Sequence, residues 1–90
     1  MRQITQGNST LNVVAHVILR NMWEYYITEL PDDTGIGWAL VMGDAVEYGS
    51  IAQADIDAYG ISYTTKLDDT DRMFPLMPPI GWEWADSVLA

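Results

Sequence analysis

Residues 23–42 constrain the fold of this chain most strongly, because they carry two strand-forming segments separated by a turn. Residues 23–29 are dense in aromatic and β-branched side chains, which favour strands. Residues 31–35 combine proline, aspartate and glycine, the residue types that build tight turns. Residues 36–42 are again mostly apolar. The sequence therefore predicts a β-hairpin over residues 23–42.

Alternation along the two predicted strands indicates which side chains face the core. Successive side chains of a strand point to opposite faces, so every second residue shares a face. The residues expected on the core-facing sides are Trp23, Tyr25 and Ile27 in the first strand and Trp38, Leu40 and Met42 in the second. We expect Trp23, Tyr25 and Trp38 together to fill a small core.

A helix over residues 11–22 is predicted to pack against this hairpin. Its apolar residues recur with helical spacing, namely Leu11, Val14, Ala15, Ile18, Leu19 and Met22. The polar residues Asn12, His16 and Arg20 recur every four positions on the other side. The β-branched residues of the segment weaken its helix propensity, but the spacing favours a helix. Residues 1–9 are expected to be a frayed lead-in.

A second, short helix is predicted over residues 51–59. Ser50 is a suitable N-cap, and Gln53 stands three residues later, as a capping box requires. Gly60 fits the left-handed position that often ends a helix. These residues therefore predict both ends of the helix.

The remaining segments complete a sketch of the fold. Residues 45–48 predict a third short strand, and residues 61–67 a fourth. Residues 82–84 are expected to end the fold or to dock on it. The predicted class is α+β: one domain over residues 1–90, with a hairpin or a three- to four-stranded antiparallel meander packed against the two helices.

Composition limits both the architecture and the ligands. A chain of 90 residues with 49% hydrophobic and 19% charged residues suits a single domain with its own core. The chain has no cysteine, so neither disulfides nor thiolate metal sites can hold the fold. The formal net charge of −9 argues against direct binding of nucleic acid or of anionic membranes. With no apolar segment long enough to span a bilayer, we expect a cytoplasmic protein.

The charge is unevenly distributed along the chain. Residues 1–23 carry two arginines and no acid, a formal charge of +2. Residues 24–90 carry all 13 acids with only Lys66 and Arg72, a formal charge of −11. Most of these carboxylates therefore lack a basic partner within the chain.

Motifs for catalysis or cofactor binding are weak. His16 is the only histidine; it could act as a general base, a pH switch or a metal ligand, but a place on the polar face of the predicted helix is the simpler interpretation. Residues 35–37 lack the third glycine of a dinucleotide fingerprint. Residues 68–71 are acidic, but the positions of an EF-hand glycine and glutamate hold Met73 and Pro79. We therefore expect no enzyme, cofactor or metal site, although a carboxylate pair stays an open alternative.

Aromatic residues exceed what so small a core can bury. The chain has four tryptophans and five tyrosines. Some of them are expected at the surface, where tryptophan and tyrosine are typical of protein interfaces. The alternative is that these rings only shield the second face of the hairpin.

Residues 23–59 resemble a family of small proteins carried by bacterial plasmids and phages. The resemblance rests on the aromatic strand 23–29, the glycine-led apolar strand 37–43, and Glu47, Gly49 and Ser50 before a short acidic helix. It implies an origin in a mobile element and supplies no catalytic residues. In size and charge the chain is also similar to acidic inhibitors of host defence, such as anti-CRISPR and anti-restriction proteins.

Two functions follow from these observations. The first is a non-catalytic acidic binding protein that engages a basic groove of a nucleic-acid-handling host protein, as a DNA mimic does. The residues expected to bind the partner are Asp32, Asp33, Asp55, Asp57, Asp68, Asp69 and Asp71. The second is a structural or assembly protein that forms a homodimer or larger oligomer through exposed aromatics and a sheet edge.

The charge imbalance predicts that added salt stabilises the protein. Mutual repulsion among the carboxylates weakens as ionic strength rises, because the screening length falls to about 10 Å at 0.1 M salt. The melting temperature, followed by circular dichroism, should therefore rise between low and moderate ionic strength. A melting temperature that stays flat over this range would contradict the prediction.

Overall fold

Strands dominate the architecture. The computed structural model describes residues 2–65, 67 and 78–85, and within them the chain forms eight strands and one short helix. In chain order these elements are β1 (Arg2–Gln6), β2 (Ser9–Val13), β3 (Ala15–Leu19), β4 (Glu24–Glu29), β5 (Ile36–Met42), β6 (Val46–Ala52), α1 (Gln53–Tyr59), β7 (Gly60–Thr64) and β8 (Glu83–Trp84). The predicted α+β class with two helices is therefore wrong.

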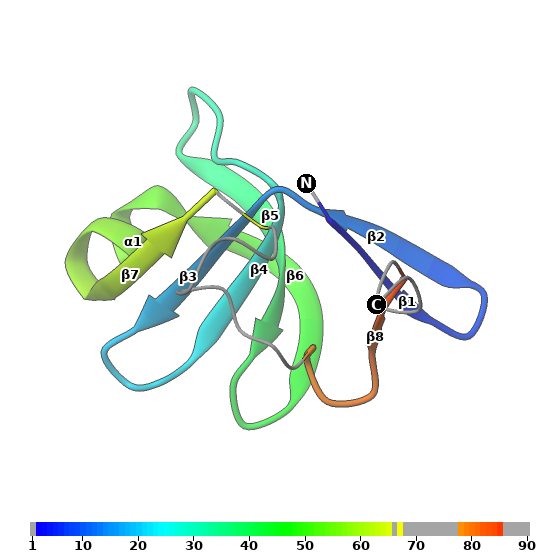
Figure 1. Ribbon diagram of the computed structural model, residues 1–90. Coiled ribbons are helices and arrows are strands. Elements are labelled where there is room, and N and C mark those ends of the chain that lie inside the picture. The colour runs from blue at the N-terminus through cyan, green and yellow to red at the C-terminus, as the bar shows by residue number, and fades with distance from the viewer. Residues whose placement is uncertain (1, 66, 68–77, 86–90) are drawn as a thin grey trace.

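The strands form two antiparallel sheets (Figure 1). The large sheet has the order β6-β5-β4-β3-β7, and the small sheet has the order β2-β1-β8. The predicted hairpin is present as β4 and β5, with Tyr26 opposite Leu40. The predicted third strand is also present but is longer, because β6 pairs with β5 from Val46 to Ala52. The predicted fourth strand is β7, which returns after α1 to pair with β3.

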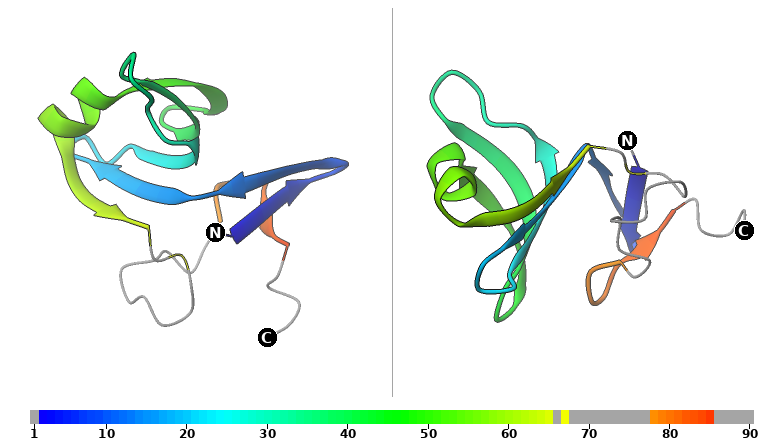
Figure 2. Two further views of the ribbon diagram at one scale, coloured as in Figure 1. Left: turned by 90° about the horizontal axis from the view of Figure 1, so that it is seen from above. Right: turned by 60° about the vertical axis from the view of Figure 1, so that its left-hand side comes forward.

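One long segment links the two sheets. β2 ends at Val13, β3 begins at Ala15, and Figure 2 shows the two strands running almost in line. The helix predicted over residues 11–22 is therefore wrong. β3 has cover on both faces, so its buried residues follow one another without alternation. Such a continuous apolar run fits helical spacing as well as a doubly buried strand, and its β-branched residues favour the strand.

The N-terminal segment is paired rather than frayed. β1 lies between two neighbours, with Ile4 opposite Leu11 of β2 and opposite Trp84 of β8. Ile4 is fully buried. Hydrogen bonds on both edges and the burial of Ile4 order the segment that was expected to fray. Of the two expectations for residues 82–84, docking holds for Glu83 and Trp84, which pair with β1.

The large sheet carries a core on each face. Tyr25, Ile27 and their buried neighbours pack on the face towards α1, where Ile56 of the helix covers them. We call this the helix-side core; its buried members are Ala15, Val17, Leu19, Tyr25, Ile27, Ala39 and Ile51. Tyr26 and Leu40 pack on the opposite face against the small sheet. We call this the small-sheet core; its buried members are Ile4, Val13, Tyr26, Leu40, Leu67 and Trp84.

The ends of α1 differ from those predicted. Ser50 lies within β6, and Ala52 is the residue that precedes the helix, with no side-chain cap. The ladder between β5 and β6 extends to the pair Ile36 and Ala52, which keeps Ser50 in the strand. Gly60 has extended backbone angles instead of left-handed ones, because it begins β7 opposite Leu19.

Candidate functional site

A pocket of about 370 Å³ opens between the β3–β4 turn and α1. Its lining residues come from both elements and from the start of β4; they are Leu19, Arg20, Asn21, Trp23, Tyr25, Asp55 and Tyr59. Leu19 and Tyr25 are buried at 4% and 9% exposure, whereas Trp23 and Tyr59 are 36% and 55% exposed. The pocket therefore has an apolar floor, exposed aromatic walls and a polar rim that includes one carboxylate.

Hydrogen bonds fix the turn that forms one side of this pocket. The backbone N–H of Leu19 donates to the Trp23 carbonyl oxygen at 2.8 Å, and the N–H of Met22 donates to the Leu19 carbonyl at 2.9 Å. The N–H of Trp23 donates to the side-chain oxygen of Asn21 at 3.0 Å. The N–H of Arg20 donates to the carbonyl of Tyr59 at 2.8 Å, which ties the turn to the end of α1.

Trp23 stands against a glycine on the neighbouring turn. A Cβ atom added to Gly43 would lie 2.8 Å from three ring atoms of Trp23, closer than van der Waals contact allows. Glu24 pairs with Met42, so Trp23 and Gly43 follow as the next pair along these two strands. The missing side chain of Gly43 thus leaves the space that the Trp23 ring occupies. Trp23 was expected in the core; instead its ring forms an exposed wall of the pocket.

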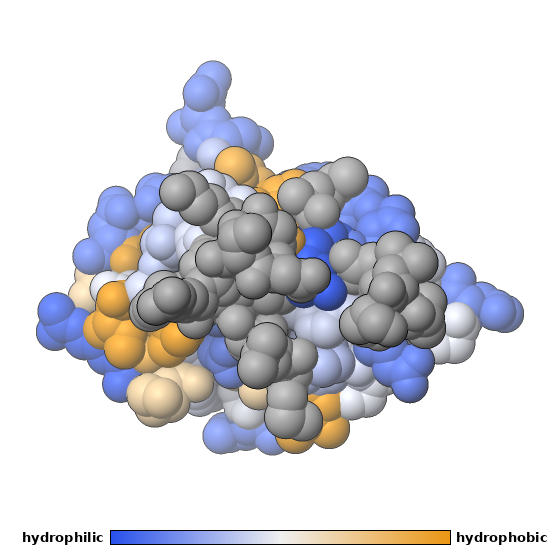
Figure 3. Space-filling model, viewed as in Figure 1, coloured by the Kyte–Doolittle hydropathy of each residue, from blue (hydrophilic) through white to orange (hydrophobic). Residues whose placement is uncertain are grey.

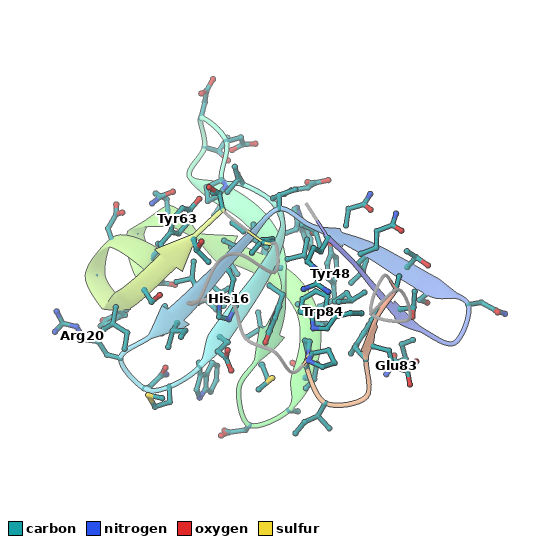
Figure 4. The ribbon with its side chains drawn as sticks, viewed as in Figure 1. His16, Arg20, Tyr48, Tyr63, Glu83 and Trp84 are labelled. Carbon is teal, nitrogen blue, oxygen red and sulfur yellow. The ribbon has the colours of Figure 1, made fainter. Side chains whose placement is uncertain are left out.

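The pocket is lined by one neutral buried phenol and two charged side chains. Burial, with a smaller contribution from Asp55, raises the pKa of Tyr25, so this phenol stays neutral at physiological pH. The charged lining residues are Asp55 and Arg20. Figure 4 shows the Arg20 side chain extending away from the body of the fold. Of these two charged residues, Asp55 comes from α1 and Arg20 from the β3–β4 turn.

The predicted binding residues Asp32 and Asp33 lie in the β4–β5 loop, both exposed. The carboxylate of Asp32 accepts hydrogen bonds from the N–H and the hydroxyl of Thr34, which lowers the pKa of Asp32. Asp32 thus shapes the turn as well as adding charge. The loop stands out from the molecule and has a hydrophilic surface (Figure 3). The Gly35 carbonyl accepts the N–H of Gln53 at 2.8 Å, which joins this loop to the first residue of α1.

The other predicted binding residues divide into two groups. Asp55 and Asp57 are exposed on α1; Asp55 lines the pocket, and Asp57 accepts a 2.8 Å hydrogen bond from the amide of Gln53. Asp68, Asp69 and Asp71 lie outside the described residues. The structure thus brings the β4–β5 loop and α1 together, which the sequence did not indicate.

His16 lies in the core, contrary to the expectation of a polar helix face. It is 1% exposed on β3, and its Nε2 is 2.8 Å from Oε1 of Glu24. Tyr26 lies beside it, with 4.8 Å between the ring centroids, and burial together with the nearby Glu24 raises the pKa of Tyr26. Burial lowers the pKa of His16, although Glu24 opposes this shift. A neutral His16 therefore donates its Nε2 proton to the Glu24 carboxylate.

A second exposed aromatic surface lies on β5 and β6. Trp38, which was expected in the core, is 42% exposed and stacks on Tyr48 with a centroid distance of 5.9 Å. The Tyr48 hydroxyl is 2.8 Å from the hydroxyl oxygen of Thr28. The expectation that some aromatics lie at the surface is confirmed for Tyr48 and Tyr59, whereas Tyr26 and Trp84 are buried.

The sequence indicated neither the pocket nor its lining. Its walls are brought together by a turn and a helix more than 30 residues apart, so no local motif marks it. The useful signal is the position of Trp23 two residues after the polar pair Arg20 and Asn21, which indicates the end of a strand rather than its middle.

Comparison with known proteins identifies no relative. A scan against protein-family models, a search of curated proteins and a search of solved structures found no match to this chain. Its resemblance to plasmid and phage proteins therefore stays a prediction. Within residues 2–65, 67 and 78–85, no group of three or more histidine and acidic side chains is arranged to hold a metal ion. The same residues contain no helix with the length and hydropathy that a bilayer crossing needs.

The environment of His16 predicts an acid-sensitive stability. Because its pKa in the folded state lies below 6.5, the unfolded state binds more protons between these two values. The contribution of neutral His16 to the free energy of unfolding is fully present above about pH 6.5. It is lost as the pH falls towards the pKa of His16 in the folded state, by at most about 1.4 kcal/mol per pH unit. As His16 is the only histidine, a one-dimensional NMR titration of its ring protons measures the value directly. A folded-state pKa at or above 6.5 would contradict this.

Proposed function

We propose that this protein is a non-catalytic binding protein that engages a basic surface of another protein. The observation that carries the proposal is the junction of the β4–β5 loop with α1, made by the hydrogen bond from Gln53 to Gly35. This junction places two pairs of exposed aspartates on adjoining elements. We call the four residues the acidic edge; they are Asp32, Asp33, Asp55 and Asp57.

The electrostatics of the whole chain support a basic partner. The formal net charge is −9, and the bases among the described residues are Arg2 and Arg20. Arg2 lies over the ring of Trp84 in the small sheet, 4.4 Å from the ring centroid, and so belongs to the other end of the fold. A surface of one sign accelerates association with a partner of the opposite sign and excludes partners of like sign.

The class of partner follows from where extended basic surfaces occur in proteins. Basic grooves are typical of proteins that handle nucleic acids, because these proteins must neutralise phosphates. Carboxylates held on a folded domain can occupy such a groove in place of phosphates. The proposed target is therefore a nucleic-acid-handling protein, such as a nuclease of host defence, with no nucleic acid bound by the chain itself.

Self-association is a second candidate function, favoured by one specific observation. Trp38 and Tyr48 form an exposed stacked pair on β5 and β6, and β6 is an edge of the large sheet within the described residues. Exposed aromatic pairs and free edges are typical of interfaces between copies. Analytical ultracentrifugation separates the two candidates, since an oligomer held by aromatic contacts persists at high salt and acidic binding to a partner does not.

Affinity capture tests the acidic edge. Immobilised protein is exposed to a nuclease-treated bacterial lysate at about 50 and about 300 mM salt, and the captured proteins are identified by mass spectrometry. The wild-type chain should retain basic proteins at low salt and lose most of them at high salt. Asp33→Asn combined with Asp57→Asn should reduce this capture, because it removes two charges from the acidic edge.

The matched control removes the same charge elsewhere. Asp44→Asn combined with Glu47→Gln neutralises two exposed carboxylates of the β5–β6 turn and β6. This control should capture the same proteins as the wild-type chain. Equal losses in the two double variants would mean that net charge, rather than the acidic edge, determines binding, and would refute the proposed surface.

A further inference from the structure

We infer that the pocket between the β3–β4 turn and α1 is a subsite for an arginine side chain presented by the basic partner. This inference rests on the proposed function and adds the chemistry of one contact to it. It is carried by the pocket itself: three aromatic side chains, Trp23, Tyr25 and Tyr59, and the Asp55 carboxylate meet around one opening of about 370 Å³.

The aromatic walls suit a cation. An aromatic ring carries negative charge density on its face, so it attracts a guanidinium or ammonium group placed over it. The same interaction occurs within this chain, where the guanidinium carbon of Arg2 lies 4.4 Å from the centroid of the Trp84 ring. The two exposed rings of the pocket, Trp23 and Tyr59, can both contact such a cation while its other side stays in water at the mouth.

Asp55 gives the pocket its specificity for positive charge. Tyr25 stays a neutral phenol, because burial and Asp55 both raise its pKa. The charged lining residues are Asp55 and Arg20, and Figure 4 shows the Arg20 side chain reaching out from the body of the fold. An incoming guanidinium would therefore meet one carboxylate and neutral rings, with Arg20 as the one positive side chain of the lining.

The walls are in place before a ligand arrives. The Trp23 ring lies against Gly43, and the turn that carries it is closed by the hydrogen bond from Leu19 to Trp23. A backbone hydrogen bond from Arg20 to Tyr59 also holds this turn against the end of α1. A preformed site loses less conformational freedom on binding, which favours affinity.

Arginine fits this site better than lysine does. Its guanidinium is planar, stacks on aromatic faces and can donate two parallel hydrogen bonds to one carboxylate. Lysine presents a compact, strongly hydrated charge that uses flat walls less well. We therefore propose arginine as the ligand of the pocket, and a lysine probe tests this choice.

NMR titration with a small probe tests the subsite apart from the acidic edge. The ¹⁵N-labelled chain is titrated with N-acetyl-L-arginine amide, and the indole and backbone N–H signals of Trp23 are followed. The control probe is the citrulline analogue, which has nearly the same shape without the charge. Asp55→Asn should weaken binding of the arginine probe by about two- to fivefold, the range expected for an exposed ion pair.

Glu83→Gln is the matched control variant. It removes the same charge from an exposed carboxylate on β8 in the small sheet, which lines neither the pocket nor the acidic edge. It should leave the affinity for the arginine probe close to that of the wild-type chain. Equal effects of the two variants, or shifts of Trp23 with the citrulline probe of the same size, would overturn the subsite.

Three further outcomes are informative. Equal affinity for N-acetyl-L-lysine amide would overturn the choice of arginine. If Trp23 does not shift with arginine while the acidic edge still captures basic proteins, the subsite is refuted and the proposed function stands. If Trp23 shifts as expected but the two double variants capture proteins equally, the proposed acidic edge fails and the pocket remains.

Discussion

Three consecutive buried residues in β4 determine the rest of the architecture. Tyr25, Tyr26 and Ile27 are all at or below 9% exposure, yet neighbouring side chains of a strand point to opposite faces. The large sheet therefore needs apolar cover on both sides. α1 closes one side through Ile56, and the small sheet closes the other, with Trp84 pointing from β8 towards the large sheet (Figure 4). The strands before and after the hairpin are needed because β4 and β5 alone leave apolar side chains exposed on both faces.

The sequence predicted the hairpin well because its signals are local. Segments dense in aromatic and β-branched residues and a turn of proline, aspartate and glycine are sufficient to specify β4 and β5 without reference to other segments. The first predicted helix failed because the apolar residues of β3 are buried on both faces, and a continuous apolar run matches helical spacing too. Ser50 and Gly60 failed as helix ends because long-range pairing with β5 and β3 overrides local capping preferences. Of the candidate site, the acidic residues could be named from sequence, but the pocket could not.

The surfaces available for binding follow from the same two-sided packing. α1 covers the helix-side core only in part, and the gap between the helix and the β3–β4 turn is the pocket. The hydrogen bond from Gln53 to Gly35 then sets the acidic loop beside the helix, so that Asp33 and Asp55 lie on adjoining elements. Inside the fold, the hydrogen bond between His16 Nε2 and Glu24 gives a partner to a polar atom that burial would otherwise penalise. The core residues of β3 and β4 thus differ from the exposed residues of the β4–β5 loop and α1 that carry the proposed binding surface.

The most direct test of the two-sided core is the free energy of unfolding, measured with urea, of three alanine variants. Ile27→Ala opens the helix-side core, Leu40→Ala opens the small-sheet core, and Ile61→Ala removes a side chain that is 58% exposed. The two core variants should each lose about 2–5 kcal/mol, and the exposed control should lose about 1 kcal/mol or less. A cost for Leu40→Ala as small as that for Ile61→Ala would mean that the small sheet does not cover the large one, and would contradict the account.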